Sequence, residues 1–180
     1  MLKDPMRNLP KNSGEYLYAL NNIHTLDLLD IKIEHISEGE FHICFSAFRE
    51  TLTHLTLMFF DMSFSAFVTL VDYFPNITTL RLGWFDVKPD EGPVPPLSRP
   101  LRGRICIDCA SSRYAEFFDR FAKLDPEYEE LVLESPFNAS KEFVEGSLRL
   151  CANTVKYLRL TTKFERELAY KTSPSLHILT

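Results

Sequence analysis

The stretch LTHLTL at residues 52–57 has leucine at its first, fourth and sixth positions, and the same spacing of apolar residues recurs along the chain. Six full copies offer eighteen such positions. Seventeen of them are apolar when Tyr128 is counted, and only Arg102 departs from the pattern. A chain with this overall composition would fill about eight of the positions by chance. Successive copies begin 29, 25, 25, 26, 27 and 21 residues apart, and the last copy is truncated. Their first residues are Ile23, Leu52, Ile77, Arg102, Tyr128, Val155 and Leu176.

The spacing within each copy is typical of a β-strand that buries alternate side chains. Between copies, apolar residues follow a helical period; Phe64, Phe67, Val68 and Val71 share one helical face behind Ser63, a favourable N-cap. Strands that alternate with helices indicate a parallel sheet with right-handed connections, and periods of roughly 20 to 29 residues are the leucine-rich-repeat signature. We therefore expect an α/β leucine-rich-repeat solenoid, with a curved parallel sheet on the concave side and helices on the convex side. The expected strands lie near residues 23–28, 52–57, 77–82, 104–108, 128–133, 155–160 and 176–179.

One connection differs from the others. Between Phe85 and Leu101 the chain reads DVKPDEGPVPPLSRP and contains five of the eleven prolines. Proline-dense sequence cannot be helical, so we expect an extended, proline-rich strap on the convex side. A linker between two domains is the alternative, but the repeat resumes on schedule after it.

The ends of the chain suggest the domain organisation. We assign residues 1–22 to an N-terminal partial repeat or cap and residues 23–180 to the solenoid. Solenoids need terminal caps with a polar outer face. Because the last copy stops inside a strand, we expect the chain to be a segment of a longer protein.

Composition excludes several classes of partner. The chain has 20 Lys and Arg against 25 Asp and Glu, a net charge of −5, which argues against a nucleic-acid binder or an anionic-membrane binder. The N-terminus is polar and holds two prolines, so no secretory signal is expected. The most apolar stretch, residues 55–71, is interrupted by Asp61 and predicts no membrane span. Four cysteines without a signal peptide indicate reduced thiols, and hence a cytoplasmic or nuclear protein.

The motifs that carry catalysis or bind metals are weak. Cys106 and Cys109 form a C-x-x-C pair on and just after a strand, without the second ligand pair that a zinc site needs. The five histidines are scattered, and no nucleotide-binding or hydrolase motif occurs. We therefore expect no enzyme activity, no catalytic, cofactor-binding or metal site, and no cofactor. A thiol redox protein that uses Cys106 and Cys109 is the least favoured alternative.

The repeat geometry selects one candidate surface. The third, fifth and seventh residues of each copy point away from the core and line the concave face. Six strands make this face about 24 Å wide, which suits a peptide or a small protein surface. The expected partner-binding residues are Asp27, His54, Thr56, Met58, Thr79, Arg81, Arg104, Cys106, Asp108, Glu130, Glu134, Tyr157 and Arg159.

Several stretches go beyond a generic repeat. Together they resemble the leucine-rich-repeat region of the large F-box protein families of mushroom-forming fungi. The resemblance implies a repeat platform that holds the substrate of a cullin ubiquitin ligase. The stretches are FSAFRETLTHLTL (45–57), SAFVTLVDYFPNITTLRL (65–82), KPDEGPVPPLSRPLRGR (88–104), EFFDRFAKLDPEYEELVL (116–133) and FVEGSLRLCANTVKYLRL (143–160).

The F-box module itself is not seen in this chain. Leu9-Pro10 resembles the Leu-Pro pair that usually announces it, but only twelve residues separate this pair from Ile23. The ligase adaptor subunit is therefore a partner only if an F-box lies upstream of this chain. The expected function is binding of a protein substrate or partner on the concave face. The alternative is a self-associating scaffold or truncated remnant without a ligase role.

Overall fold

We describe the chain from a computed structural model. The structure describes residues 22–30, 42, 45–84, 86–88, 96–108, 115–134, 140–150 and 153–161. The predicted cap (apart from residue 22), much of the predicted strap and the predicted strand near 176–179 lie outside the described residues, as does Cys109.

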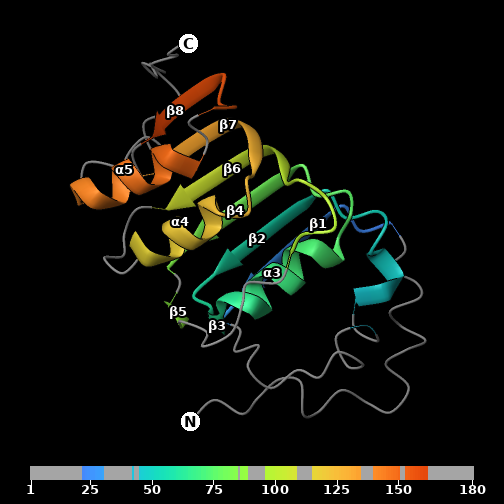
Figure 1. The fold of residues 1–180 in the computed structure, drawn as a ribbon. Coiled ribbons are helices and arrows are strands. Elements are labelled where there is room, and N and C mark those ends of the chain that lie inside the picture. The colour runs from blue at the N-terminus through green and yellow to red at the C-terminus, as the bar shows by residue number, and fades with distance from the viewer. Residues whose placement is uncertain are drawn as a thin grey trace.

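Six parallel strands form one sheet in the order β1-β2-β4-β6-β7-β8, so their order in space follows their order in the chain (Figure 1). Two short strands, β3 and β5, follow β2 and β4 and pair with each other in parallel. The protein is therefore of the mixed α/β class with a six-stranded parallel sheet. The strands are β1 (Thr25–Leu29), β2 (His54–Met58), β3 (Asp61–Ser63), β4 (Thr79–Gly83), β5 (Asp86–Lys88), β6 (Arg102–Asp108), β7 (Glu127–Glu134) and β8 (Tyr157–Thr161).

Four of the strands begin two residues later than the sequence predicts. The first apolar residue of each of these copies lies in the turn before the strand, where Leu52 and Ile77 are buried and Ile23 and Val155 are partly buried. In that turn the backbone amides of Thr53 and His54 both donate to the carbonyl of His24, at 2.9 Å each. By contrast, β6 and β7 begin earlier than predicted, because their pairing continues past an irregularity of register at Gly103. The short pair β3 and β5 was not predicted.

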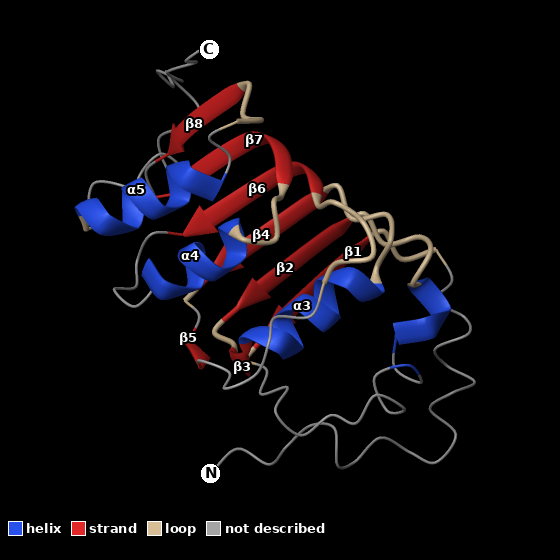
Figure 2. Ribbon diagram, viewed as in Figure 1, coloured by secondary structure: helices blue, strands red, loops and turns tan. Residues whose placement is uncertain are grey.

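The described helices all lie on one face of the six-stranded sheet (Figure 2). The N-cap predicted at Ser63 is present, because Ser63 Oγ accepts from the amide of Ala66 at 3.2 Å. Ser140 Oγ likewise accepts from the amide of Phe143 at 3.2 Å, at the start of the helix that begins at Lys141. Such caps satisfy amides that the first helical turn leaves without partners. The helices are η3 (Ser46–Phe48), α3 (Phe64–Tyr73), α4 (Ala115–Ala122) and α5 (Lys141–Leu150).

The core fills the layer between the sheet and the helices. The strands contribute the apolar residues of the repeat, and the helices contribute phenylalanine rings. The ring of Phe67 in α3 packs edge-to-face against the rings of Phe117 and Phe121 in α4, with centroids 5.2 and 5.3 Å apart. Edge-to-face packing adds to the stabilisation by burial and joins neighbouring helices.

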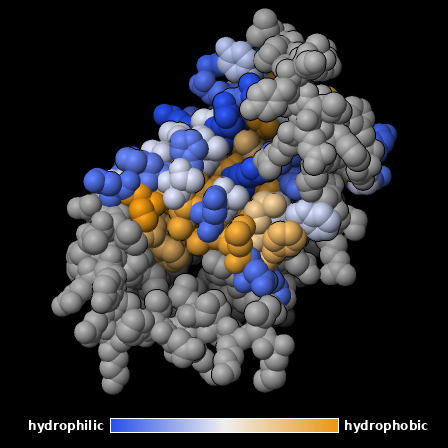
Figure 3. Space-filling model, turned by 180° about the vertical axis from the view of Figure 1, so that it is seen from behind, coloured by the Kyte–Doolittle hydropathy of each residue, from blue (hydrophilic) through white to orange (hydrophobic). Residues whose placement is uncertain are grey.

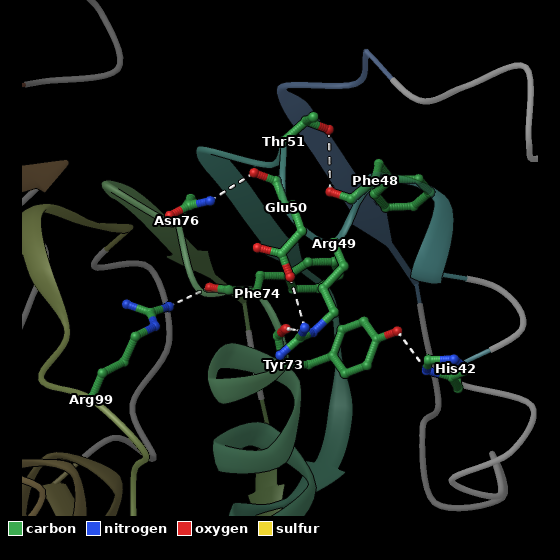
Figure 4. Close-up of polar contacts among 9 residues, drawn as sticks. All are labelled: His42, Phe48, Arg49, Glu50, Thr51, Tyr73, Phe74, Asn76 and Arg99. Carbon is green, nitrogen blue, oxygen red and sulfur yellow. Dashed lines mark hydrogen bonds and ion pairs between the residues drawn. The ribbon is translucent and has the colours of Figure 1, made fainter.

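The connections on either side of α3 are tied to its C-terminal end (Figure 4). Arg49 Nε donates to the carbonyl of Tyr73 at 2.9 Å, and Arg99 donates to the carbonyl of Phe74. Arg99 belongs to the proline-rich connection, whose described parts, residues 86–88 and 96–100, contain no helix, as predicted. Two guanidinium groups at a helix C-terminus satisfy its carbonyls and oppose the negative end of its dipole. The helix thus fixes the chain before and after it.

Replacing Gly103 by alanine should destabilise the fold strongly. Gly103 has φ +91°, and a Cβ there would collide with the backbone oxygen of Thr78, which cannot move independently of the turn before β4. We expect the free energy of unfolding to fall by about 3 kcal/mol in urea denaturation. Gly83→Ala is the matched control, because its Cβ would meet chiefly the end of the flexible Met58 side chain; it should cost about 1 kcal/mol. Equal losses for the two variants would contradict this account.

Candidate functional site

The side chains that alternate with the core residues form the second face of the sheet, which we call the open face. None of the described helices covers it, because they all lie against the other face (Figures 1 and 2). Strand register arranges its eighteen residues in three rows, and all thirteen predicted partner-binding residues fall in these rows. The rows are Thr25, His54, Thr79, Arg104, Glu130 and Tyr157; Asp27, Thr56, Arg81, Cys106, Val132 and Arg159; and Leu29, Met58, Gly83, Asp108, Glu134 and Thr161.

Three arginines of the open face form ion pairs within the chain. Arg81 Nη2 on β4 lies 2.6 Å from Glu134 Oε2 on β7, so this pair crosses over β6. Arg104 Nε lies 2.7 Å from Glu130 Oε2, and Arg159 Nη2 lies 3.6 Å from the other oxygen of Glu130. These arginines were predicted only as partner contacts. The structure adds that each is held in place by a carboxylate of β7.

The two carboxylates of this network are mostly shielded from solvent. The side chains of Glu130 and Glu134 are 17% and 18% exposed, whereas those of Arg104 and Arg159 are more than 40% exposed. Removing an arginine would leave a poorly solvated carboxylate, which is costly. The exposed parts of Arg104 and Arg159 still face solvent, and Tyr157 beside them is exposed. This end of the face therefore presents preorganised guanidinium groups and an aromatic ring.

Asp108 was predicted to contact a partner, and this prediction is wrong because the residue is buried. It lies in the third row, but its relative exposure is only 1%. Val132, in the second row, is also buried. The pair of Arg81 and Glu134 spans the strand that carries Asp108, so this part of the face is closed off by its own side chains. A partner that docks on the open face without rearrangement cannot contact Asp108.

Cys106 lies in the second row, on β6 between the strands of the crossing ion pair. Burial, and to a smaller extent the carboxylate of Glu134, raises the pKa of its thiol to about 11, because Arg104 and Arg81 offset only part of the increase. A thiol with this pKa is protonated at neutral pH and is a poor nucleophile. The environment of Cys106 therefore gives no support to redox chemistry at the C-x-x-C pair.

An exposed apolar area lies at the other end of the face, where β1, β2 and β4 finish. It consists of Leu29, Met58, Phe59 and Trp84, which we call the apolar patch. Leu29, Phe59 and Trp84 are 60%, 55% and 41% exposed, and the rings of Phe59 and Trp84 stack with centroids 5.9 Å apart. Figure 3 shows hydrophobic surface gathered in the centre of this side of the molecule, with hydrophilic surface along its upper border.

Sequence reasoning missed Phe59 and Trp84, because each lies one position beyond the repeat template. The available signal was the aromatic residue directly after the third-row position on two consecutive strands, following Met58 and Gly83. A strand end is normally polar or glycine-rich, so a large ring there is unusual.

Two polar residues outside the predicted contact set have partners within the chain. His24 Nδ1 lies 2.9 Å from the carbonyl oxygen of Thr51, and Arg102 pairs with Glu127 at 2.7 Å. Within the described ranges, no group of three or more His, Cys, Asp or Glu is arranged to hold a metal ion. The helices of the same ranges include none with the length and apolar character needed to cross a membrane.

Alkylation should confirm the low reactivity of Cys106. From its pKa of about 11, we expect the folded chain to react with iodoacetamide at pH 8 about 100-fold more slowly at Cys106 than a free thiol does. Peptide mass spectrometry after timed quenching measures this site separately from the other cysteines, with the urea-unfolded chain as the reference. Rapid labelling of Cys106 in the folded chain would favour the thiol redox alternative instead.

Comparisons with protein-family models, with curated proteins and with solved structures found no match to this chain.

Proposed function

We propose that this chain is a leucine-rich-repeat solenoid that binds another protein on the open face of its sheet. The observation that carries the proposal is the alignment of the repeat residues into three rows across six strands, with no described helix over them. A sheet face of this kind is a broad surface rather than a cavity. It suits an extended peptide or a protein surface better than a small molecule.

The residue types on the face support this function. Arginine, tyrosine and tryptophan are enriched at the energetic centres of protein interfaces. Arg159 and Tyr157 are both substantially exposed on β8, and Arg104 lies two strands away. Glu130 holds both arginines, so a partner that meets them incurs less of the entropic cost of ordering long side chains.

The cellular role we propose follows from the resemblance to fungal F-box proteins. In this role the open face is the substrate-recognition surface of a ubiquitin-ligase receptor, and the bound protein is the substrate. The cullin-ligase adaptor enters the proposal only through an F-box encoded upstream of this chain. The open face itself would then act as the recognition module and not in catalysis.

A pair of matched double variants tests the binding face. Tyr157→Ala with Arg159→Ala removes an exposed ring and an exposed arginine from the open face. Leu148→Ala with Arg149→Ala removes an exposed apolar residue and an exposed arginine from α5, on the opposite side. Each arginine makes one ion pair, at 3.6 Å to Glu130 or at 3.2 Å to Asp119. Glu130 is the less exposed of the two carboxylates, but it keeps its ion pair with Arg104 when Arg159 is removed.

We expect the open-face double variant to lose its partners. The immobilised wild-type chain and both variants are incubated with extract of the source organism, and the captured proteins are quantified by mass spectrometry. The captured amount of each protein that the wild type enriches should fall about 30-fold on the open-face variant, which is the effect of losing a typical hot spot. The α5 variant should capture the same proteins in unchanged amounts. Equal capture by all three chains would contradict the proposal. Melting temperatures measured beforehand establish that both variants are folded.

Solution mass separates this function from self-association. If the scaffold alternative holds, the mass measured by light scattering rises with protein concentration and the captured material is the chain itself. The proposed function predicts capture of other proteins and a mass that stays constant over the dilution series.

A further inference from the structure

Three consecutive strands of the sheet end in the same unusual backbone conformation. The residues after β1, β2 and β4 are Asp30, Phe59 and Trp84, with φ of 56°, 54° and 51°. Asparagine, aspartate and glycine tolerate this left-handed region, but large aromatic residues are rare there, and such strain costs of order 1 kcal/mol or more. Asp30 therefore suits its position, whereas Phe59 and Trp84 do not.

Neither of the two aromatic residues belongs to the core. Phe59 and Trp84 stack on each other at an interplanar angle of 21°, but both remain substantially exposed to solvent. Glycine in either place would relieve the backbone strain. Strained residues of this kind cluster at functional sites, so the two rings point to a role in binding rather than in folding.

Backbone hydrogen bonds hold the three strand ends side by side. The amide of Asp30 donates to the carbonyl of Met58 at 3.0 Å, and the amide of Phe59 donates to the carbonyl of Gly83 at 3.1 Å. Gly83 has no side chain, and Met58 lies over it, with its sulfur where a Cβ would collide. The apolar patch is thus continuous from Leu29 to Trp84, and Asp30 lies at its border.

The charge beside the apolar patch is negative and not neutralised within the described part of the chain. Asp27 and Asp30 are exposed, and neither forms an ion pair with a described residue. Arg81, which lies two strands from Asp27 in the same row, is the nearest arginine in that row and is already paired with Glu134. Apolar surface, exposed ring faces and free carboxylates together match a cationic group on an apolar segment. Arginine fits best, because its planar guanidinium both stacks on aromatic rings and donates to carboxylates.

We propose that the apolar patch, together with Asp27 and Asp30, is a subsite for an arginine-bearing apolar segment of the partner protein. The guanidinium stacks on the exposed ring surface of Phe59 and Trp84 and donates to Asp30, and the flanking apolar side chains pack on Leu29 and Met58. This inference rests on the proposed function, because it names the chemistry of the segment that one end of the open face receives.

Trp84 provides a direct readout, because it is the only tryptophan of the chain. The full chain is titrated with short synthetic peptides of alternating leucine and one polar residue, which is arginine, glutamine or glutamate. We expect the arginine peptide to change Trp84 emission saturably, the glutamine peptide to bind about tenfold more weakly, and the glutamate peptide not to bind. Equal affinities for the arginine and glutamine peptides, or no emission change up to millimolar arginine peptide, would overturn the inference.

Variants then assign the charge selectivity. The double variant Asp27→Asn with Asp30→Asn should bind the arginine peptide about tenfold more weakly. Asparagine tolerates the left-handed backbone at residue 30, so the conformation there is kept. Asp125→Asn is the control for Asp30, because Asp125 is also an exposed aspartate with positive φ, at 51°, but lies in the turn before β7. An unchanged affinity in the double variant, or an equal loss in Asp125→Asn, would overturn the inference.

The two proposals fail separately. If the arginine peptide does not bind but Tyr157→Ala with Arg159→Ala still loses the cellular partners, the subsite is wrong and the binding face stands. If that variant keeps every partner while the arginine peptide binds at the apolar patch, the subsite stands and the rest of the open face has no part in recognition.

Discussion

Backbone hydrogen bonds in the turn before each strand hold the sheet in a common register. The carbonyl of Thr53 accepts from the amides of Thr78 and Thr79 at 2.9 and 3.0 Å, repeating the contact that His24 makes one strand earlier. A shift of one residue between two strands would exchange the core leucines with the residues of the open face. The core and the open face are therefore two consequences of one turn geometry, and neither can change without the other.

This dependence explains which parts of the structure the sequence predicts well. Burial alternates along a strand, so the repeat alone assigns Leu55 and Leu57 to the core and His54 and Thr56 to the open face, as the structure has them. Strand starts were predicted less well, because an apolar residue such as Leu52 packs into the core from a turn as readily as from a strand. The pair β3 and β5 has only three residues in each strand, too few for any periodic signal.

The electrostatics of the open face could not be predicted from sequence. Arg81 and Glu134 are 53 residues apart and lie on strands that are not neighbours, so only their side-chain conformations bring them together. Burial of Asp108 follows from the same arrangement. The strain at Phe59 and Trp84 is likewise invisible to the repeat template, which ends one residue earlier. Position on the face was predictable from local alternation, whereas accessibility depended on contacts between distant residues.

The open face divides into two ends that serve different purposes under the proposed function. Towards β8, carboxylates of β7 hold the arginines, which limits both their mobility and the net charge that a partner meets. Towards β1, two aspartates and two strained rings are exposed, and neither Asp27 nor Asp30 forms an ion pair with a described residue. A group without an ion pair in the chain gains a new contact on binding, whereas an arginine already held by a carboxylate loses less side-chain entropy when a partner meets it. The two ends should therefore contribute to binding in different ways, through new contacts towards β1 and through preordered side chains towards β8.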